Sequence, residues 1–151
     1  MLFRSANAYL AKGDKPAVIA ELERYVKAGG RNPGSIKELA KQLEDAGRKK
    51  EAADVLNRLN YIYPMDNDQH QSLGALWMDQ GNLAGAIREF RAVVAHNPID
   101  PARSHYDLAR AYQSNHEPEQ AKDELLAALE TAPGYRPAQK LLLELTTTEA
   151  K

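Results

Sequence analysis

Apolar residues recur with a helical period in the middle of the chain. Leu73 and Trp77 are four residues apart, and so are Ala86 and Phe90, so each pair shares one face of a helix. Gly81 lies between the two pairs, where a tight turn is needed. The pattern therefore predicts a hairpin of two amphipathic helices, which we expect at residues 68–80 and 83–96.

Small residues within this hairpin indicate that its helices pack closely. Gly74 follows Leu73, and Ala86 lies one turn before Phe90. A larger side chain at either small residue would push the two helix backbones apart. Trp77 and Phe90 are the bulky side chains on either side of the crossing. We therefore expect Gly74 and Ala86 to be buried between the helices.

The hairpin recurs along the chain at a nearly constant interval. Gly47 and Gly81 are 34 residues apart, and Pro98 and Pro133 are 35 residues apart. Matched positions in successive copies are Ala6, Ala40, Gly74 and Ala109 on the first helix, and Leu22, Leu56, Phe90 and Leu125 on the second. One hairpin cannot bury its own apolar face, so repetition at this period predicts stacked hairpins in a helical solenoid.

Four copies and a final helix account for most of the chain. Proline and capping residues at the helix starts support the same divisions, as at Asn32-Pro33 and Asp100-Pro101. We expect a single domain, 1–151, with repeats at about 1–32, 33–66, 67–100 and 102–135 and a capping helix at about 136–146. The first helix is predicted at 2–12. The helix that follows Gly47, in the second repeat, is predicted at 49–63, and the last helix at about 136–145. A short polar tail follows the last helix, and we expect it to be disordered.

In these features the chain resembles the tetratricopeptide repeat (TPR) family of helical hairpins about 34 residues long. The third copy carries the family pattern at His70, Leu73, Gly74, Trp77, Ala86, Phe90 and Pro98, and the fourth at His105, Leu108, Ala109, Tyr112, Ala121, Leu125 and Pro133. The first copy is weaker, because Gly30 stands where the closing proline is expected. The resemblance implies an all-α, right-handed superhelical solenoid of antiparallel helix-turn-helix repeats.

The resemblance also implies a binding surface, because the first helices of TPR hairpins line a groove that commonly holds an extended peptide or a partner helix. Helical geometry at 100° per residue selects the side chains on that flank. The expected groove residues are Asn7, Lys37, Lys41, Gln71, Met78, Arg103, Tyr106 and Arg110. Their charges are mixed with acidic neighbours, so the flank is not a purely basic cradle.

Some TPR domains hold the acidic tail of heat-shock chaperones in a clamp of Lys, Asn and Arg residues. Asn7 fits that pattern here, but Phe3 stands at the first Lys position and Glu38 at the next Asn position. Asp68 and Ser72 replace the remaining cations. The resemblance does not extend to this clamp, and we expect no tight binding of such tails.

The composition of the chain disfavours several classes of partner and of location. The formal net charge is −1, so we expect no nucleic-acid partner, and the chain has no cysteine for disulfides or thiolate chemistry. No apolar run reaches the roughly 18 residues of a membrane helix, and the start lacks a signal-peptide pattern. We therefore expect a soluble protein without membrane insertion, with the cytoplasm favoured over other compartments.

No motif of known catalytic or metal-binding chemistry is found in the sequence. The chain lacks a Gly-rich phosphate loop, a nucleophile elbow and a His-Glu-x-x-His pair. His70 and His105 occupy matching positions in adjacent repeats, where we expect them to pack rather than to bind zinc. The sequence therefore predicts no enzyme activity, no metal and no cofactor.

The favoured interpretation is a non-catalytic scaffold for protein–protein interaction that binds a peptide or partner helix in its groove. The alternative is a C-terminal TPR accessory domain of a larger multidomain enzyme or of a secretion or assembly component, since Leu2 and Phe3 make an apolar start that preceding residues could cover. RNA binding by pentatricopeptide-like hairpins is a third option, which the closing prolines and the charge disfavour. Self-association through a terminal repeat is a fourth.

Overall fold

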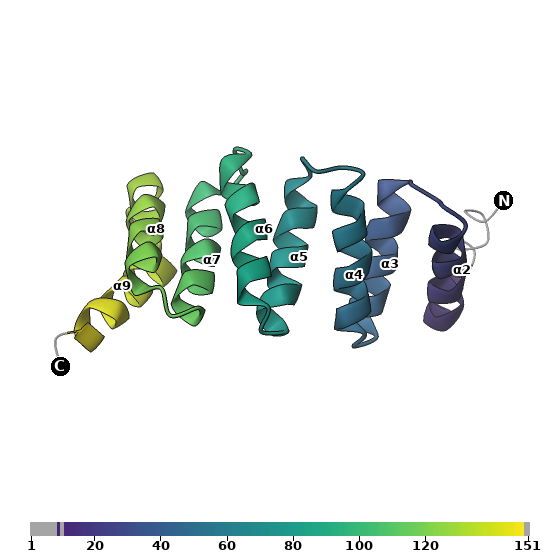
Figure 1. Cartoon of the computed structure of the whole chain (residues 1–151), viewed down its shortest axis with the longest axis horizontal. Coiled ribbons are helices and arrows are strands. Elements are labelled where there is room, and N and C mark those ends of the chain that lie inside the picture. The colour runs from purple at the N-terminus through teal and green to yellow at the C-terminus, as the bar shows by residue number, and fades with distance from the viewer. Residues whose placement is uncertain (1–8, 10, 150–151) are drawn as a thin grey trace. The chain divides into compact units, whose positions relative to one another are not determined.

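The computed structural model describes residues 9 and 11–149, and the regular structure of this part of the chain is entirely helical (Figure 1). Tyr9, Ala11 and Lys12 are helical, while most of the first predicted helix, 2–12, lies outside the described residues. The following helices are α2 (Lys15–Lys27), α3 (Pro33–Asp45), α4 (Lys49–Asn60), α5 (Asn67–Asp79), α6 (Leu83–Ala95), α7 (Pro101–Ser114), α8 (Pro118–Thr131) and α9 (Arg136–Glu149). The all-α prediction is confirmed.

The chain forms two compact units, Met1–Gln69 and His70–Lys151. In the first unit α3 packs against both α2 and α4. In the second unit α7 packs against α6 and α8, and α9 packs against α8. Helix α5 begins in the first unit and continues in the second. The single domain expected from the sequence stays a prediction.

Side-chain caps begin most of the helices. Asp14, Asn32, Asn82 and Asp100 each accept a hydrogen bond from the backbone N–H three residues later, at 3.0–3.2 Å. Asp66 accepts the same bond from Gln69, at 3.1 Å, and so begins α5. Such a bond satisfies a backbone donor that the helix itself leaves unpaired. The starts predicted from Asn-Pro and Asp-Pro pairs are confirmed at α3 and α7.

One turn geometry joins the two helices of every hairpin. Gly13, Gly47 and Gly81 have φ angles of 70°, 77° and 74°, and His116 takes the matching place with φ 60°. In each turn the next N–H donates to a carbonyl five residues back, as from Asn82 to Trp77 at 2.9 Å. These are the bonds of a Schellman motif, whose left-handed residue is usually glycine. The turn of the fourth hairpin thus has a histidine at the position where the other three turns have a glycine.

The helix crossing predicted in the third repeat is confirmed. A Cβ atom added to Gly74 would lie 2.7 Å from the Phe90 ring, and one added to Gly85 would lie 2.6 Å from the Trp77 ring. Ala86 is fully buried beside them. Each aromatic ring of the α5–α6 hairpin therefore occupies the space that a glycine on the opposite helix leaves free.

Two helix ends differ from the prediction. Helix α4 ends at Asn60 rather than at residue 63, because the N–H groups of Ile62 and Tyr63 both turn back to the Leu59 carbonyl. Helix α9 continues to Glu149 instead of ending near 145, so the expectation of a disordered tail after Leu145 is wrong for Thr146 and Thr147. Their hydroxyl groups donate to the carbonyls of the preceding turn, at 2.9–3.1 Å, which keeps these polar residues in the helix.

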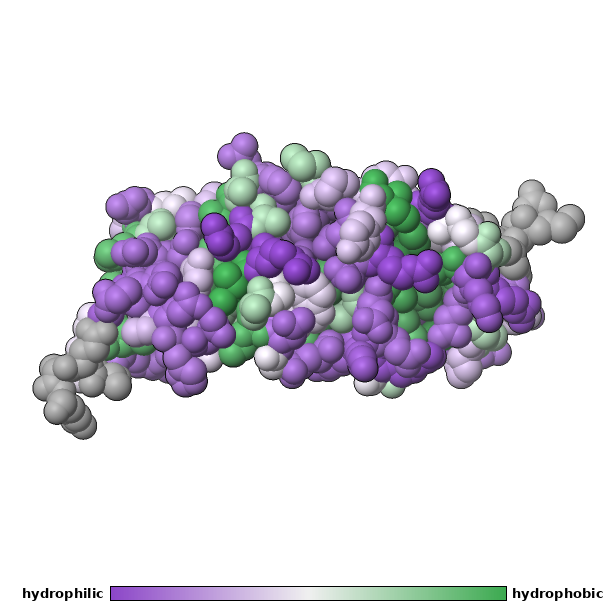
Figure 2. All heavy atoms as spheres, viewed as in Figure 1, coloured by the Kyte–Doolittle hydropathy of each residue, from purple (hydrophilic) through white to green (hydrophobic). Residues whose placement is uncertain are grey.

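The visible surface is mainly polar, with apolar strips between helices (Figure 2). In the first unit one strip lies between α2 and α4, over a hollow of about 320 Å³ whose apolar lining includes Val26, Leu39 and Val55. Leu39, on α3, is only 1% exposed, so little of its side chain reaches the solvent. The hollow is therefore shallow, and the core beneath it is closed to solvent.

Candidate functional site

Helices α5 and α7 place four of the predicted groove residues around one hollow in the second unit. The hollow measures about 170 Å³, and its lining includes Gln71, Met78, Arg103 and Arg110, with Phe90 among them. Gln71 and Met78 lie two turns apart on α5, and the two arginines lie two turns apart on α7. The first helices of two successive repeats thus face the same space, as the 100° rule predicts.

Asp107 connects the two helices at this hollow. Gln71 Nε2 on α5 donates to Asp107 Oδ2 at 2.7 Å, and Arg103 Nε lies 3.7 Å from the same oxygen. The Asp107 side chain is 13% exposed, whereas that of Arg103 is 67% exposed. The carboxylate is therefore held within the wall, while the guanidinium remains open to a ligand.

Tyr106 lies on α7 beside a second hollow. Its ring centroid is 6.0 Å from the Arg110 guanidinium and 5.7 Å from the Tyr135 ring, which it meets edge-on. The second hollow, of about 460 Å³, is lined by Tyr106, Leu141 and charged residues of α9. Burial, followed by the nearby charges of Asp107 and Asp100, raises the pKa of the Tyr135 hydroxyl. Tyr135 is therefore neutral at physiological pH, and the two rings offer aromatic surface and hydroxyl groups to a ligand.

The other predicted groove residues are not part of this cluster. Lys37 forms an ion pair with Asp66 in the first unit, and its side chain is 34% exposed. Lys41, one turn later on α3, is exposed. Asn7 lies outside the described residues. The structure thus brings together Gln71, Met78, Arg103 and Arg110, with Tyr106 adjoining through Arg110.

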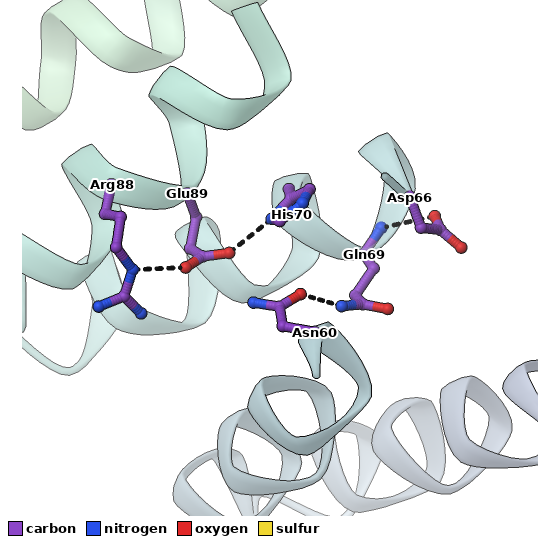
Figure 3. A network of polar contacts seen from close by, with 6 residues as sticks. All are labelled: Asn60, Asp66, Gln69, His70, Arg88 and Glu89. Carbon is purple, nitrogen blue, oxygen red and sulfur yellow. Dashed lines mark hydrogen bonds and ion pairs between the residues drawn. The ribbon is translucent and has the colours of Figure 1, made fainter. Parts of the chain in front are cut away.

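The sequence reading missed two histidine–glutamate pairs in the second unit. His70 Nδ1 lies 2.7 Å from Glu89 Oε2, and His105 Nδ1 lies 2.6 Å from Glu124 Oε2. Figure 3 shows Glu89 between His70 and Arg88, whose Nε is 3.0 Å from the other carboxylate oxygen. Each glutamate follows its histidine by nineteen residues, and this repeated spacing was the signal in the sequence.

The first of these pairs is the more deeply buried. The side chains of His70 and Glu89 are 8% and 3% exposed, against 22% and 24% for His105 and Glu124. The matched positions in the second repeat hold Ile36 and Val55. The pairs therefore replace apolar contacts between the two helices of a hairpin, and they connect α5 to α6 and α7 to α8.

A separate set of polar contacts lies at the C-terminal end of the first unit, where α5 begins. Gln69 donates from its side chain to Asn60 Oδ1, and its backbone N–H donates to Asp66 (Figure 3). Burial would raise the pKa of Asp66, but the Lys37 ammonium and backbone N–H groups stabilise the carboxylate more strongly, so its pKa is lowered. Asp66 therefore both caps the N-terminus of α5 and forms an ion pair with Lys37.

Two further properties concern the described part of the chain. It contains no group of three or more His, Asp or Glu side chains arranged to hold a metal ion. None of its helices combines the length and the apolar character needed to cross a membrane.

The paired helices, the repeated turn and the small-residue crossings define a protein of the helical-repeat class. Residues 78–145 match the model of the tetratricopeptide repeat family, and the chain as a whole has the fold of solved TPR proteins. No curated protein is similar enough in sequence to count as a relative.

Solved TPR structures share this fold at low sequence identity. A crystal structure of MamA is 20% identical, with a TM-score of 0.82 over 96% of this chain and 84% of MamA. YrrB, described as a TPR protein with an unusual peptide-binding site, is 22% identical, with a TM-score of 0.75 over 93% of this chain and 72% of YrrB. The first TPR of Spaghetti (RPAP3), bound to the HSP90 peptide SRMEEVD, is 19% identical, with a TM-score of 0.68 over 77% of this chain and 91% of that domain.

Proposed function

We propose that this protein is a non-catalytic scaffold for protein–protein interaction, and that it binds an extended peptide or a partner helix along the first helices of its repeats. The observation that carries the proposal is the hollow where Gln71 and Met78 of α5 face Arg103 and Arg110 of α7. Two similar structures are described with a peptide or a peptide-binding site, which supports the same kind of partner.

The chemistry of the hollow favours a partner that supplies both polar and apolar groups. Met78 and Phe90 offer apolar surface, and Arg103 and Arg110 offer forked donors that suit carboxylates and peptide carbonyls. The arginines are exposed, so their contacts with a ligand would decide specificity more than affinity. We propose Lys41 and Asn7 as further contacts on the first helices of earlier repeats.

A pull-down with charge-reversed variants tests the proposal. Partners captured by the wild-type chain are quantified against Arg110→Glu, against Lys41→Glu, and against the double variant. Arg91→Glu, an exposed charge reversal on α6, is the matched control. We expect the Arg110→Glu variants to lose specific partners that Arg91→Glu keeps, and an identical set of partners for all variants would contradict a role for the groove.

A further inference from the structure

A second exposed surface lies in the connection between α4 and α5, on the first unit. Tyr61 is 86% exposed and Met65 is 71% exposed, and Ile62 and Tyr63 between them are also exposed. Contiguous apolar and aromatic side chains on a surface commonly mark an interaction site, and Tyr, Met and Arg are enriched in such sites.

The repeat architecture does not require these side chains. Residues 61–63 read Tyr-Ile-Tyr, whereas the matched positions read Lys27-Ala28-Gly29 in the first repeat, Ala95-His96-Asn97 in the third and Glu130-Thr131-Ala132 in the fourth. Since the same connection forms with small and polar residues elsewhere in the chain, folding alone does not account for the aromatic cluster.

A hollow adjoins the cluster and carries positive charge. It measures about 600 Å³ and is lined by Val26, Gly29, Gly30, Arg31, Arg58, Tyr61 and Ile62. The connections that follow α2 and α4 lie along the same edge of the unit (Figure 1). Arg31 and Arg58 are exposed, and no acidic residue lines this hollow. Glu51 and Asp54 line the neighbouring hollow instead.

The local contacts fix the walls of the hollow. The Tyr25 ring covers Gly30, where an added Cβ would overlap the ring, and the Tyr25 hydroxyl accepts a hydrogen bond from the Asn32 N–H at 3.0 Å. The α2–α3 connection is therefore held against α2, which leaves room beside Val26 for a ligand.

From this geometry we infer that the hollow is a second docking site, distinct from the groove, and that it takes a short protein segment in which an acidic side chain lies next to an apolar one. The acidic group pairs with Arg31 and Arg58, and the apolar group packs against Val26, Tyr61 and Ile62. Membrane surfaces are usually bound by larger clusters of cations on an open face. A concave hollow with two arginines fits a peptide better.

Selection from a phage-displayed library of random peptides tests this inference without assuming a sequence. Peptides are selected on the full wild-type chain and then depleted on the Arg58→Ala/Tyr61→Ala variant. Both substitutions copy the third repeat, which has Ala92 and Ala95 at the matched positions, so the fold should accept them. Circular dichroism of the variant checks that it does.

We expect a class of peptides enriched in Asp or Glu beside Leu or Phe that binds the wild-type chain at least about tenfold more tightly than the variant, the effect of about one charge-assisted contact. This class should bind Arg110→Glu and Arg91→Ala like the wild type, which separates the site from the groove. Failure to find peptides that depend on Arg58 and Tyr61, or a dependent class without acidic residues, would overturn the inference.

Two other occupants are distinguished by parallel measurements. Sedimentation with vesicles of phosphatidylserine and phosphatidylcholine that is lost in the double variant would show a membrane surface instead of a peptide. A change from dimer to monomer in the double variant, seen by light scattering, would show that a second copy of the chain occupies the hollow. Either result would overturn the assignment to a peptide.

Discussion

His116 holds the backbone conformation that Gly81 holds one repeat earlier, with φ 60° against 74°. Both residues end the first helix of a hairpin, and the N–H that follows each donates to the carbonyl five residues back, at 2.9 Å. The left-handed conformation costs a residue with a Cβ atom about 1–2 kcal/mol relative to the right-handed one. The turn between α7 and α8 therefore contains local strain that the glycine turns at Gly13, Gly47 and Gly81 avoid.

Replacing this residue should stabilise the protein. We expect His116→Gly to raise the free energy of unfolding by about 0.5–1 kcal/mol, because relief of the strain exceeds the entropy that glycine adds to the unfolded chain. Urea unfolding followed by circular dichroism measures the change. Ser114→Gly, two residues earlier inside α7, should instead destabilise the chain, and a His116→Gly variant no more stable than wild type would refute this account.

The close contact between Gly74 and Phe90 at the α5–α6 crossing predicts that a substitution at one residue can compensate for a substitution at the other. Gly74→Ala should cost about 1–3 kcal/mol, because the new Cβ would lie 2.7 Å from the Phe90 ring. The matched positions of the fourth repeat hold Ala109 and Leu125. We therefore expect Phe90→Leu to restore much of the loss.

A double-mutant cycle measured by urea unfolding tests this coupling, which we expect to be about 1–2 kcal/mol. The Phe90→Leu variant alone should be destabilised by about 1 kcal/mol through the space it leaves. Additive effects of the two substitutions would mean that the ring and the glycine do not exclude each other in solution.

The buried His70–Glu89 pair makes a related prediction. His70→Ile alone should cost about 1–3 kcal/mol, because it removes a hydrogen-bond partner from a carboxylate that is 3% exposed. The double variant His70→Ile/Glu89→Val copies Ile36 and Val55 of the second repeat, and we expect its stability to be close to that of the wild type. Thermal unfolding of the wild type and the two variants distinguishes the two cases, and a double variant less stable than His70→Ile would show that the pair cannot be replaced by apolar packing.

The Lys37–Asp66 pair should make stability depend on acidity. The folded chain holds the pKa of Asp66 below its ordinary value of 3.8, so the charged carboxylate stabilises the folded state above that pH, and the contribution is lost as the pH falls through the lowered pKa. Asp66→Asn keeps a capping side chain but removes the charge. We therefore expect the variant to be less stable than the wild type at neutral pH and to approach it in acid.

Urea unfolding at several pH values measures that difference. Lys37→Met is the companion variant, since it removes the cation and should reduce the pH dependence that Asp66 confers. A constant difference between wild type and Asp66→Asn at all pH values would mean that the charge of Asp66 does not contribute.

The local features of the fold were predictable where one residue type has one physical use. Gly81 had to be a turn and Gly74 a close approach, and the structure confirms both. The left-handed conformation of His116 was not predicted, since histidine adopts it more often than most residues but far less often than glycine. The extension of α9 was missed because threonine is a weak helix former whose hydroxyl bonds to the preceding turn appear only in the structure.

The candidate site was predictable in part. Helical geometry placed Gln71, Met78, Arg103 and Arg110 on one flank, and they line one hollow. The ion pair of Lys37 was not foreseen, because its partner, Asp66, lies in a connection whose path periodicity does not determine. The exposed cluster from Tyr61 to Met65 was also not predicted, since the exposure of an aromatic residue depends on the positions of its neighbours.

Trp77 gives the protein a built-in spectroscopic reporter. It is the single tryptophan of the chain, and its ring lies against Gly85 with the Arg88 guanidinium 4.8 Å from the ring centroid. Its emission therefore follows the loosening of the α5–α6 hairpin, while the far-ultraviolet signal averages over all helices. Because repeat proteins can lose their hairpins in separate steps, the two signals together would show whether this hairpin melts with its neighbours or apart from them.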